Sequence, residues 1–595
     1  MEGGGFRALT SYAGLTAGLL HAVPGLGGGE EESFTELFKP VDMLSSNSGG
    51  SWFAASLAYS SKFQSVIFNM SKHINEASDI LYDQILRPFI GNLSTQGHNN
   101  KTDEQFWRSV DSAVHKAYDY NPTTTPFNPE WIWEILEELA FASDGTNNWD
   151  DFVSAFLKYG MGISSTEPSG SPVNAWAKGK TWLAAVSLLT PGGRGPGNCA
   201  SSSTWWWCAG NLPPVFKNNA GSTPVVVSRQ NLKHPLQTVY WAEGQNFWKQ
   251  AVMYPAKFEV QLGGGINQDS TLPFCGPFGD VAMCNSLSFT YFSTSGSWEG
   301  SRATGAPVNS FPWYTANPGS LSIAGIAGAS SAFLGIAALL PLDSNGARQS
   351  ARDIVEWLEW FGFPKEYSEV LYEVLVNITK TDWTVWTLDH PARQTDKTMF
   401  QSGRSMVREV TMFESQAPQN ILDKMAQGQF TGLIDGAFTD NTGVAHAAAS
   451  GATEIVGFFD GMSDIWSHFE GVPRTESLMN FIDTCLLCSL NFQIFQENYQ
   501  VVKERFDRTA VNLTYPGATH LSGILVGTIQ ATTCENEDMG IHAGRPVLIR
   551  VVSVESTLGM GGFKYSDYTD LAQEVTLTLQ ANKKYAAQIV EWLSK

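Results

Sequence analysis

Stretches of alternating apolar and polar residues predict an α/β protein whose core is divided along the chain. Apolar residues spaced three or four apart predict helices at 7–20 and 52–59, and an extended segment is predicted between them at 41–46. The same pattern returns after residue 320, with strands predicted at 430–434, 454–459 and 545–554 and helices at 442–450 and 571–593. We therefore expect residues 1–60 and 321–595 to form two parts of one core, with 61–320 inserted between them.

The insertion changes character along its length. Residues 61–160 are predicted to be largely helical, and Ile132, Ile135, Leu136 and Leu139 form one apolar stripe of such a helix. Residues 161–320 are rich in Gly, Pro, Ser and Trp, with short strands predicted at 223–228 and 256–262. For the triplet at 205–207 (Trp-Trp-Trp), a buried cluster is favoured over a surface that meets lipid or substrate. We interpret the insertion as a candidate cap or lid.

One apolar run, residues 321–342, is long enough to cross a membrane. It consists mostly of Ala, Gly and Ser, and it lacks the basic flanks and aromatic anchors of membrane spans. We therefore predict a buried core helix and no transmembrane span. The first residues, from Met1 to Arg7, have neither the basic nor the apolar region of a signal peptide.

Composition narrows the functional classes. The chain has 595 residues, is 43% hydrophobic and carries a net charge of −21, so it has enough apolar residues for a sizeable core and little affinity for nucleic acid or strongly anionic membranes. The 20 Trp predict an unusually aromatic surface or pocket. Zwitterionic or neutral lipids fit this charge better than anionic ones.

The spacing of the cysteines bears on the compartment in which the protein works. Two pairs, Cys199/Cys208 and Cys275/Cys284, lie nine residues apart in stretches where short disulfide loops close easily, which favours a secreted or lumenal protein. Cys485 and Cys488 have no second pair beside them, so a zinc site is not expected. Elsewhere too, no cluster has metal-ligand spacing, so we expect a reaction without metal or cofactor.

A run of glycines opens the chain. Gly3, Gly4 and Gly5 precede Phe6, Arg7 and a predicted helix. Consecutive glycines let backbone N–H groups converge, and the start of the helix adds a positive partial charge, so the segment is a candidate anion site. A simple tight turn explains a glycine triplet equally well.

A second motif surrounds Ser48. A short strand ends in Ser46 and Asn47, and Ser48, Gly49 and Gly50 lead into the next predicted helix. This is the layout of a nucleophile elbow, in which small neighbours leave room for a serine on a sharp turn. Ser46 replaces the glycine usual two positions before the nucleophile. Taken alone, the motif is more often a serine-rich turn without chemistry.

A third motif follows a predicted strand near residue 434. Asp435 stands at the end of this strand and precedes Gly436. A carboxylate at the carboxyl edge of a parallel sheet is well placed to act as a base, although Asp-Gly is also a common turn.

The order of the three motifs resembles that of the patatin-like acyl hydrolases. GGGFRA at 3–8 and SGGSW at 48–52 are similar to the group of cytosolic phospholipase A2 and fungal lysophospholipase (phospholipase B), and DGAFTDN at 435–441 is closer to the patatin branch. The resemblance implies a central, mostly parallel sheet flanked by helices, with a long insertion between nucleophile and base. Family members also begin with an apolar strand before the glycines, where this chain has only Met1 and Glu2, so we expect a truncated start or another segment in its place.

The resemblance also implies roles for these residues. Ser48 would be the nucleophile, Asp435 its general base in a dyad, and the amides of Gly3, Gly4 and Gly5 the oxyanion hole. Arg7 would pair with the phosphate of the substrate, and Gly49 and Gly50 would support the elbow. The implied activity is hydrolysis of phospholipid or lysophospholipid esters at a membrane or micelle surface.

Alternatives remain for the base and for the activity. His446, on the predicted helix 442–450, is the nearest histidine after Asp435 and would complete a triad, although a structural histidine is favoured. A lipid-binding or storage protein that has lost catalysis and a hydrolase of soluble esters are the competing functions.

Overall fold

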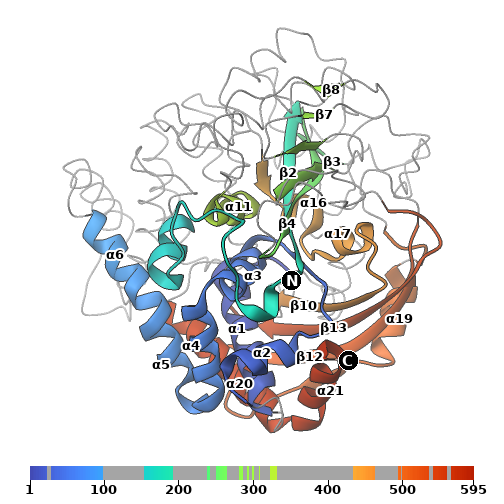
Figure 1. Ribbon diagram of the computed structural model, residues 1–595. Coiled ribbons are helices and arrows are strands. Elements are labelled where there is room, and N and C mark those ends of the chain that lie inside the picture. Colours follow the sequence, from blue (N-terminus) through green and yellow to red (C-terminus); the bar gives the residue numbers. More distant parts are fainter. Residues whose placement is uncertain are drawn as a thin grey trace, which may run out of the picture.

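The computed structural model describes fifteen stretches of the chain (Figure 1). They are residues 1–22, 28–97, 153–191, 237–240, 250–263, 281–285, 291–293, 298–299, 307–308, 322–331, 433–462, 494–497, 499–534, 541–558 and 565–594.

Helices make up most of residues 1–97 as described, and further helices occur among the strands of the later stretches. The longer ones are α1 (Gly5–Ala22), α2 (Glu30–Leu37), α3 (Ser48–Tyr59), α4 (Ser61–Lys72), α6 (Arg87–Gly97), α11 (Ile323–Ser330), α19 (Tyr499–Asp507), α20 (Tyr565–Ala581) and α21 (Lys583–Ser594). The shorter ones are η1 (Ile74–Glu76), α5 (Ala77–Leu81), η2 (Tyr82–Leu86), η3 (Phe156–Met161), η4 (Ala175–Ala177), α16 (Ala437–Asp440) and α17 (Val444–Ala449).

The strands form two sheets. The first has the order β1 (Met43–Ser46), β2 (Thr181–Pro191), β4 (Gln250–Gln261), β5 (Val281–Asn285), β6 (Tyr291–Ser293), β7 (Trp298–Glu299) and β8 (Pro307–Val308), with β3 (Gln237–Tyr240) on β4 and β9 (Leu433–Asp435) on β2. The second has the order β10 (Glu454–Met462), β13 (Pro546–Ser556), β12 (Leu521–Thr532) and β11 (Val511–Leu513).

The protein is of mixed α/β class, but parallel pairing is limited. Among the described strands, β1 with β2 and β10 with β13 are parallel, and the other pairs are antiparallel. The expectation of a mostly parallel sheet is therefore wrong for the described residues. The reason is that β4 and β9 both run antiparallel to β2, and β12 runs antiparallel to β13.

Residues 1–3 lie between the two sheets and hydrogen-bond to both. The Met1 ammonium donates to the Ser45 carbonyl at 2.8 Å, and the Asn47 amide donates to the Met1 carbonyl at 3.2 Å, on the β1 side. The Glu2 amide donates to the Phe458 carbonyl of β10 at 3.0 Å. In Figure 1 this end of the chain accordingly lies at the centre of the molecule, above β10. The segment before the glycines thus lies between β1 and β10 without forming a strand itself.

Helix α1 is buried along almost its whole length because small residues let its neighbours approach. A Cβ on Gly14 would lie 2.3 Å from the Ala572 carbonyl oxygen of α20, so only glycine permits this contact. The hydroxyls of Thr10 and Thr16 donate to helix carbonyls four residues earlier, which satisfies polar groups that water does not reach. The first glycine-rich segment is therefore anchored to a helix in the main core.

The predicted elements of the two core parts are confirmed where the structure describes them, with two differences. The helix predicted at 571–593 is divided at Asn582 into α20 and α21. Strand β2, which belongs to the region interpreted as an insertion, pairs with β4 along one edge and with both β1 and β9 along the other, and so forms part of the sheet that carries Ser46 and Asp435. In the apolar run at 321–342, α11 is buried, and no described helix has the length and apolar character needed to cross a membrane.

Several predictions fall outside the described residues. These are the helix around 131–140, the strand at 223–228, the Trp triplet at 205–207, and the cysteines Cys199, Cys208, Cys275, Cys485 and Cys488. The two disulfides and the role of the insertion as a cap or lid stay predictions.

Candidate active site

Ser48 stands on a strained turn between a strand and a helix. Strand β1 ends at Ser46, Asn47 is extended, and Ser48 begins α3 with a φ of 48°. Within the described part of the chain, no other residue except glycine has a positive φ. A non-glycine residue held in this region stores strain of roughly 1–3 kcal/mol and is typical of functional turns. The backbone thus has the geometry of a nucleophile elbow.

The glycines after Ser48 let the first residues of the chain pack against the turn. A Cβ on Gly49 would lie 2.1 Å from the carbonyl oxygen and 2.6 Å from the nitrogen of Gly5. A Cβ on Gly50 would lie 2.6 Å from the Glu2 carbonyl oxygen. All three distances are shorter than the contacts that real Cβ atoms make, so the predicted supporting role of Gly49 and Gly50 has a steric basis: they allow the glycine loop to lie beside Ser48.

Asp435 lies within hydrogen-bonding reach of Ser48. It is the last residue of β9 and is 1% exposed, and Ser48 is 8% exposed. The Ala437 amide donates to its Oδ1 at 2.8 Å, and the side chains of Ser48 and Asn47 lie close enough to the carboxyl to lower its pKa. The structure therefore brings together two residues that are 387 positions apart in the sequence.

Burial gives Asp435 the acid strength of a general base. Loss of water raises the pKa of its carboxyl from 3.8 to about 7, and the hydrogen bonds from Ala437, Ser48 and Asn47 oppose that rise. A base is most effective when its pKa lies near the working pH, because it is then partly ionised and still able to take a proton. Asp435 meets this condition at neutral pH.

The glycine loop offers two free amides, not three. The Gly3 N–H donates to the Asn441 carbonyl at 3.0 Å, so the expectation that Gly3 contributes to an oxyanion hole is wrong. Within the described part of the chain, no acceptor is bound to the amides of Gly4 and Gly5. Their φ angles of 147° and 59° lie in the region that favours glycine. Gly4 and Gly5 are the remaining candidates from this loop.

Arg7 is a structural residue in this arrangement. Its guanidinium donates from Nε to Asp460 Oδ2 at 2.7 Å, from Nη1 to the Leu558 carbonyl at 2.9 Å, and from Nη2 to the Asp460 carbonyl at 3.0 Å. The side chain is 2% exposed. The expectation that Arg7 binds a substrate phosphate is therefore wrong, because each nitrogen already has a buried protein partner.

Sequence reasoning missed the serines at the end of α11. Ser330 Oγ accepts from the Ser48 amide at 3.2 Å and contacts Ser51 Oγ at 2.8 Å, and the Ser330 carbonyl accepts from the Gly436 amide at 3.3 Å. Ser331 Oγ accepts from the indole of Trp52 at 2.9 Å. Ser330 thus ties the nucleophile turn to the base turn. The only available signal was a pair of serines closing an Ala/Gly-rich helix.

Ser46, which replaces the expected glycine, is buried and fully used. Its hydroxyl accepts from the Trp182 indole at 2.8 Å and contacts Ser51 Oγ at 3.0 Å. The small serine side chain therefore fits the elbow and links it to β2.

His446 lies on α17 and is 3% exposed. Burial, with a smaller effect of Lys257, lowers the pKa of its imidazole well below the usual value. Among the described residues, Ala437, Ser48 and Asn47 are the groups that lower the pKa of Asp435, and His446 is not one of them. The geometry therefore favours a Ser–Asp pair over a triad.

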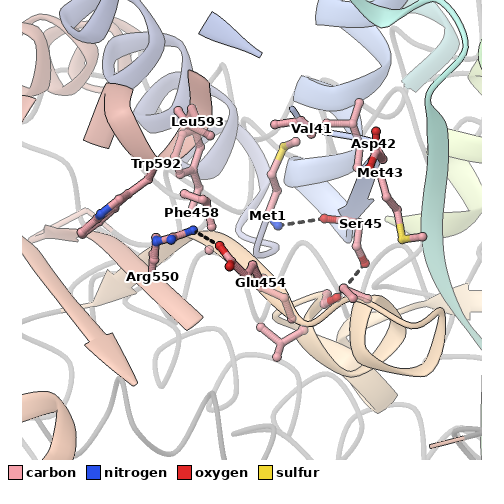
Figure 2. Close-up of a pocket in the computed structure, with 18 of the residues that line it drawn as sticks. Met1, Val41, Asp42, Met43, Ser45, Glu454, Phe458, Arg550, Trp592 and Leu593 are labelled. Atoms are coloured by element: carbon pink, nitrogen blue, oxygen red, sulfur yellow. Dashed lines mark hydrogen bonds and ion pairs between the residues drawn. The ribbon is translucent and has the colours of Figure 1, made fainter. Parts of the chain in front are cut away.

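A cavity lies next to Met1 and is separate from the Ser–Asp pair. It has a volume of about 980 Å³ and is lined by β1, α17, β10 and the end of α21, and neither Ser48 nor Asp435 lines it. Figure 2 shows Met1 in this cavity, between Ser45 on one side and Phe458 on the other. The Arg550–Glu454 ion pair, at 2.6 Å, closes part of its wall. The cavity is therefore a gap between the sheets beside the candidate site.

One group of described residues has the side chains of a metal site. His520, Asp567 and Asp570 bring potential ligand atoms within 4.8 Å of one another. Asp570 is exposed and its Oδ1 already accepts from Ser78 Oγ at 2.6 Å. Exposed acidic groups of this kind are common without an ion, so the group has no assigned role.

Comparisons with known proteins give no relative: no family model, no curated protein and no solved structure matches the chain.

Proposed function

We propose that the protein is a serine acyl hydrolase that cleaves carboxylic esters of lipids through Ser48 and Asp435. The observation that carries the proposal is the strained Ser48 at the strand–helix turn, in hydrogen-bonding reach of a buried carboxyl whose pKa is about 7. A turn without chemistry needs neither the positive φ nor the buried acid. Both features cost stability, and both serve a nucleophile and its base.

In the first half of the reaction, Asp435 takes the proton of the Ser48 hydroxyl while Oγ attacks the ester carbonyl carbon. The negative charge that develops on the carbonyl oxygen is stabilised by the amides of Gly4 and Gly5, and the Gly49 amide at the start of α3 adds a third donor. As the tetrahedral intermediate collapses, the protonated Asp435 returns the proton to the leaving alkoxide, and the acyl group stays on Ser48.

In the second half, water replaces the alcohol. Asp435 takes a proton from the water, whose oxygen attacks the acyl-enzyme carbonyl. Collapse of the second intermediate releases the fatty acid, and the proton on Asp435 returns to Ser48 Oγ. No step needs a residue beyond the pair and the amide donors.

The family and the lipid substrate are part of the proposal. They rest on the order of the motifs at 3–8, 48–52 and 435–441, which resembles the patatin-like acyl hydrolases. The pairing of β1 and β9 with β2 supports the proposal, because the ends of both strands, next to Ser48 and at Asp435, lie at neighbouring places along β2.

A second candidate is a hydrolase of esters without a phosphate group, either neutral lipids or soluble esters. The specific observation in its favour is the engagement of Arg7 by Asp460 and Leu558, which removes the cation that was expected to bind phosphate.

The test measures fatty-acid release from mixed phosphatidylcholine micelles, from triacylglycerol emulsions and from a short soluble ester, each with and without chelator. We expect release that resists the chelator and that is lost by at least 10³-fold in Ser48→Ala, because the nucleophile is gone. The matched control is Ser56→Ala, which removes a buried α3 hydroxyl that has no hydrogen-bond partner in the described structure.

The three substrates distinguish the candidates. A jump in rate when phosphatidylcholine forms micelles supports phospholipid hydrolysis, and activity limited to triacylglycerol or the soluble ester supports the second candidate. Lipid binding without release from any substrate would contradict both and favour a catalytically silent lipid-binding protein.

A further inference from the structure

Three buried polar side chains connect the nucleophile turn, the base turn and the glycine loop. Asn47 Nδ2 donates to Asn441 Oδ1 at 3.0 Å, and Asn441 Nδ2 donates to Glu2 Oε1 at 2.8 Å. The exposed fraction is 0% for Asn47, 8% for Asn441 and 1% for Glu2. Asn441 also holds the loop through its backbone, since its carbonyl accepts from the Gly3 amide at 3.0 Å. Asn441, which follows the base turn, therefore hydrogen-bonds to two residues at the start of the chain, Glu2 and Gly3.

Asn47 reaches the base as well as the loop. Its side chain lies close enough to the Asp435 carboxyl to lower the pKa of that group, and Asn47 directly precedes Ser48 in the chain. Gly3 packs closely against both asparagines and Ser48. A Cβ on Gly3 would lie 2.6 Å from Asn47 Nδ2, 2.7 Å from Asn441 Oδ1 and 2.8 Å from Ser48 Cβ. The amide pair and the nucleophile thus share one surface of the loop.

The glycine loop depends on such tethers. Gly4 and Gly5 have backbone angles that glycine adopts freely, so the positions of their amides are set by contacts on either side and not by their own conformational preference. The start of the loop is held by Met1 between Ser45 and Phe458 (Figure 2). The Asn441 bonds hold the next two residues, immediately before the free amides.

We propose that Asn47 and Asn441 are positioning residues: their amide–amide hydrogen bond fixes the oxyanion amides relative to Ser48 and Asp435. This inference rests on the proposed function, and it adds a specific pair of residues to it. Neither residue is assigned contact with the substrate: each acts through Asp435 or through the glycine loop. Displacement of a reacting group by about 1 Å is enough to lower a rate by roughly 10²-fold.

The bridge has a cost that a purely structural pair would avoid. Within the described structure, Asn47 Oδ1 is buried without a hydrogen-bond donor, and an unsatisfied buried amide oxygen destabilises a fold. Leucine has the same branched arrangement of side-chain heavy atoms as asparagine and no polar atom, and replacing both partners of a buried hydrogen bond by apolar groups of the same shape can be nearly neutral for stability. Stability and activity should therefore respond differently to the same substitutions.

The experiment compares Asn47→Leu, Asn441→Leu and the double variant with wild type. The rate of covalent labelling by a fluorophosphonate probe is measured from pH 5 to 9, with thermal unfolding recorded in parallel. The matched control is Asn174→Leu, which removes an asparagine that donates to the carbonyls of Leu57 and Ser60 at 2.8 and 3.2 Å.

We expect each single variant to be labelled about 10–100-fold more slowly at pH 8, and the double variant to be no slower than the slower single one, because both changes break the same bridge. Asn47→Leu also moves the apparent pKa of labelling upward, since the carboxylate loses a hydrogen bond. Asn174→Leu changes neither the rate nor the pKa.

Other results overturn the inference in distinct ways. Folded single variants with wild-type rates and pH profiles would show that the bridge positions nothing. If the rate losses of the two single variants add in the double variant, the two residues act independently and not as a bridge. If the rate losses only follow the fall in melting temperature, the bridge has a structural role alone. Absence of labelling in wild type would instead overturn the proposed function, and this inference with it.

Discussion

Two buried aspartates close to the glycine loop differ in the groups that surround their carboxyls. Asp460 has a charged partner, since Arg7 Nε donates to it at 2.7 Å. Among the residues that the structure describes, the groups that lower the pKa of Asp435 are neutral, namely the Ala437 amide and the side chains of Ser48 and Asn47. Burial raises the pKa of Asp435 to about 7 and that of Asp460 to about 6.

We interpret Asp460 as a structural residue and Asp435 as the proposed base. An ion pair occupies the carboxylate oxygens of Asp460 and links α1 to β10, so Asp460 is fixed in place. Neutral donors leave Asp435 without a compensating charge, so it takes up and releases a proton near neutral pH. The first arrangement holds the loop, and the second supplies a base beside Ser48.

The largest effect is expected for Asp435→Asn. Loss of the base should slow labelling of Ser48 by about 10²–10⁴-fold, while the fold becomes more stable at pH 8. The unfolded carboxyl ionises near pH 3.8 and the folded one near 7, so wild type loses stability as the pH rises from about 4 to 7. At ~1.4 kcal/mol per pKa unit, removal of this cost is worth on the order of 2–4 kcal/mol.

Urea unfolding at pH 5 and pH 8 measures this effect. The gain in the free energy of unfolding should be larger at pH 8 than at pH 5. A variant that is less stable than wild type at pH 8 would mean that Asp435 is ionised at little cost, as a structural acid would be.

Arg7→Met should lower stability without a specific effect on phosphate binding. Removal of the cation leaves Asp460 buried and uncompensated, which costs about 3–5 kcal/mol. The loss should be greater at pH 8 than at pH 5, since Asp460 takes up a proton at the lower pH. The double variant Arg7→Met with Asp460→Asn should recover much of the loss.

The matched control is Arg550→Met, whose ion pair with Glu454 is partly exposed and is expected to contribute under about 1 kcal/mol. A substrate test completes the comparison. If Arg7 bound phosphate, its loss would raise KM for phosphatidylcholine selectively, whereas we expect the ratio of KM values for phosphatidylcholine and a neutral ester to stay unchanged.

Local pattern was enough to predict the elements that carry the candidate pair. The extended segment at 41–46, the turn at Ser48 and the strand ending at Asp435 each have a signal within about ten residues. Their roles came from a resemblance in motif order, which the comparisons leave untested. The steric function of Gly49 and Gly50 fits the small residues that an elbow requires.

Long-range partners could not be predicted. Arg7 lies beside a glycine run in the sequence, but its role depends on Asp460, 453 residues away. The Gly3 amide is occupied by Asn441, and the Ser48 amide by Ser330, contacts that only the tertiary structure defines. The direction of β4 and β9 beside β2 likewise depends on how the chain returns, which apolar periodicity does not encode.

The most direct test of the account is the pH dependence of fluorophosphonate labelling of the wild-type protein, with the labelled residue identified by peptide mass spectrometry. The account predicts a single label on Ser48, formed at a rate that rises with pH and has an apparent pKa of about 7. A label on another serine, or a rate on Ser48 that does not change between pH 5 and 9, would contradict the assignment of Ser48 and Asp435 as nucleophile and base.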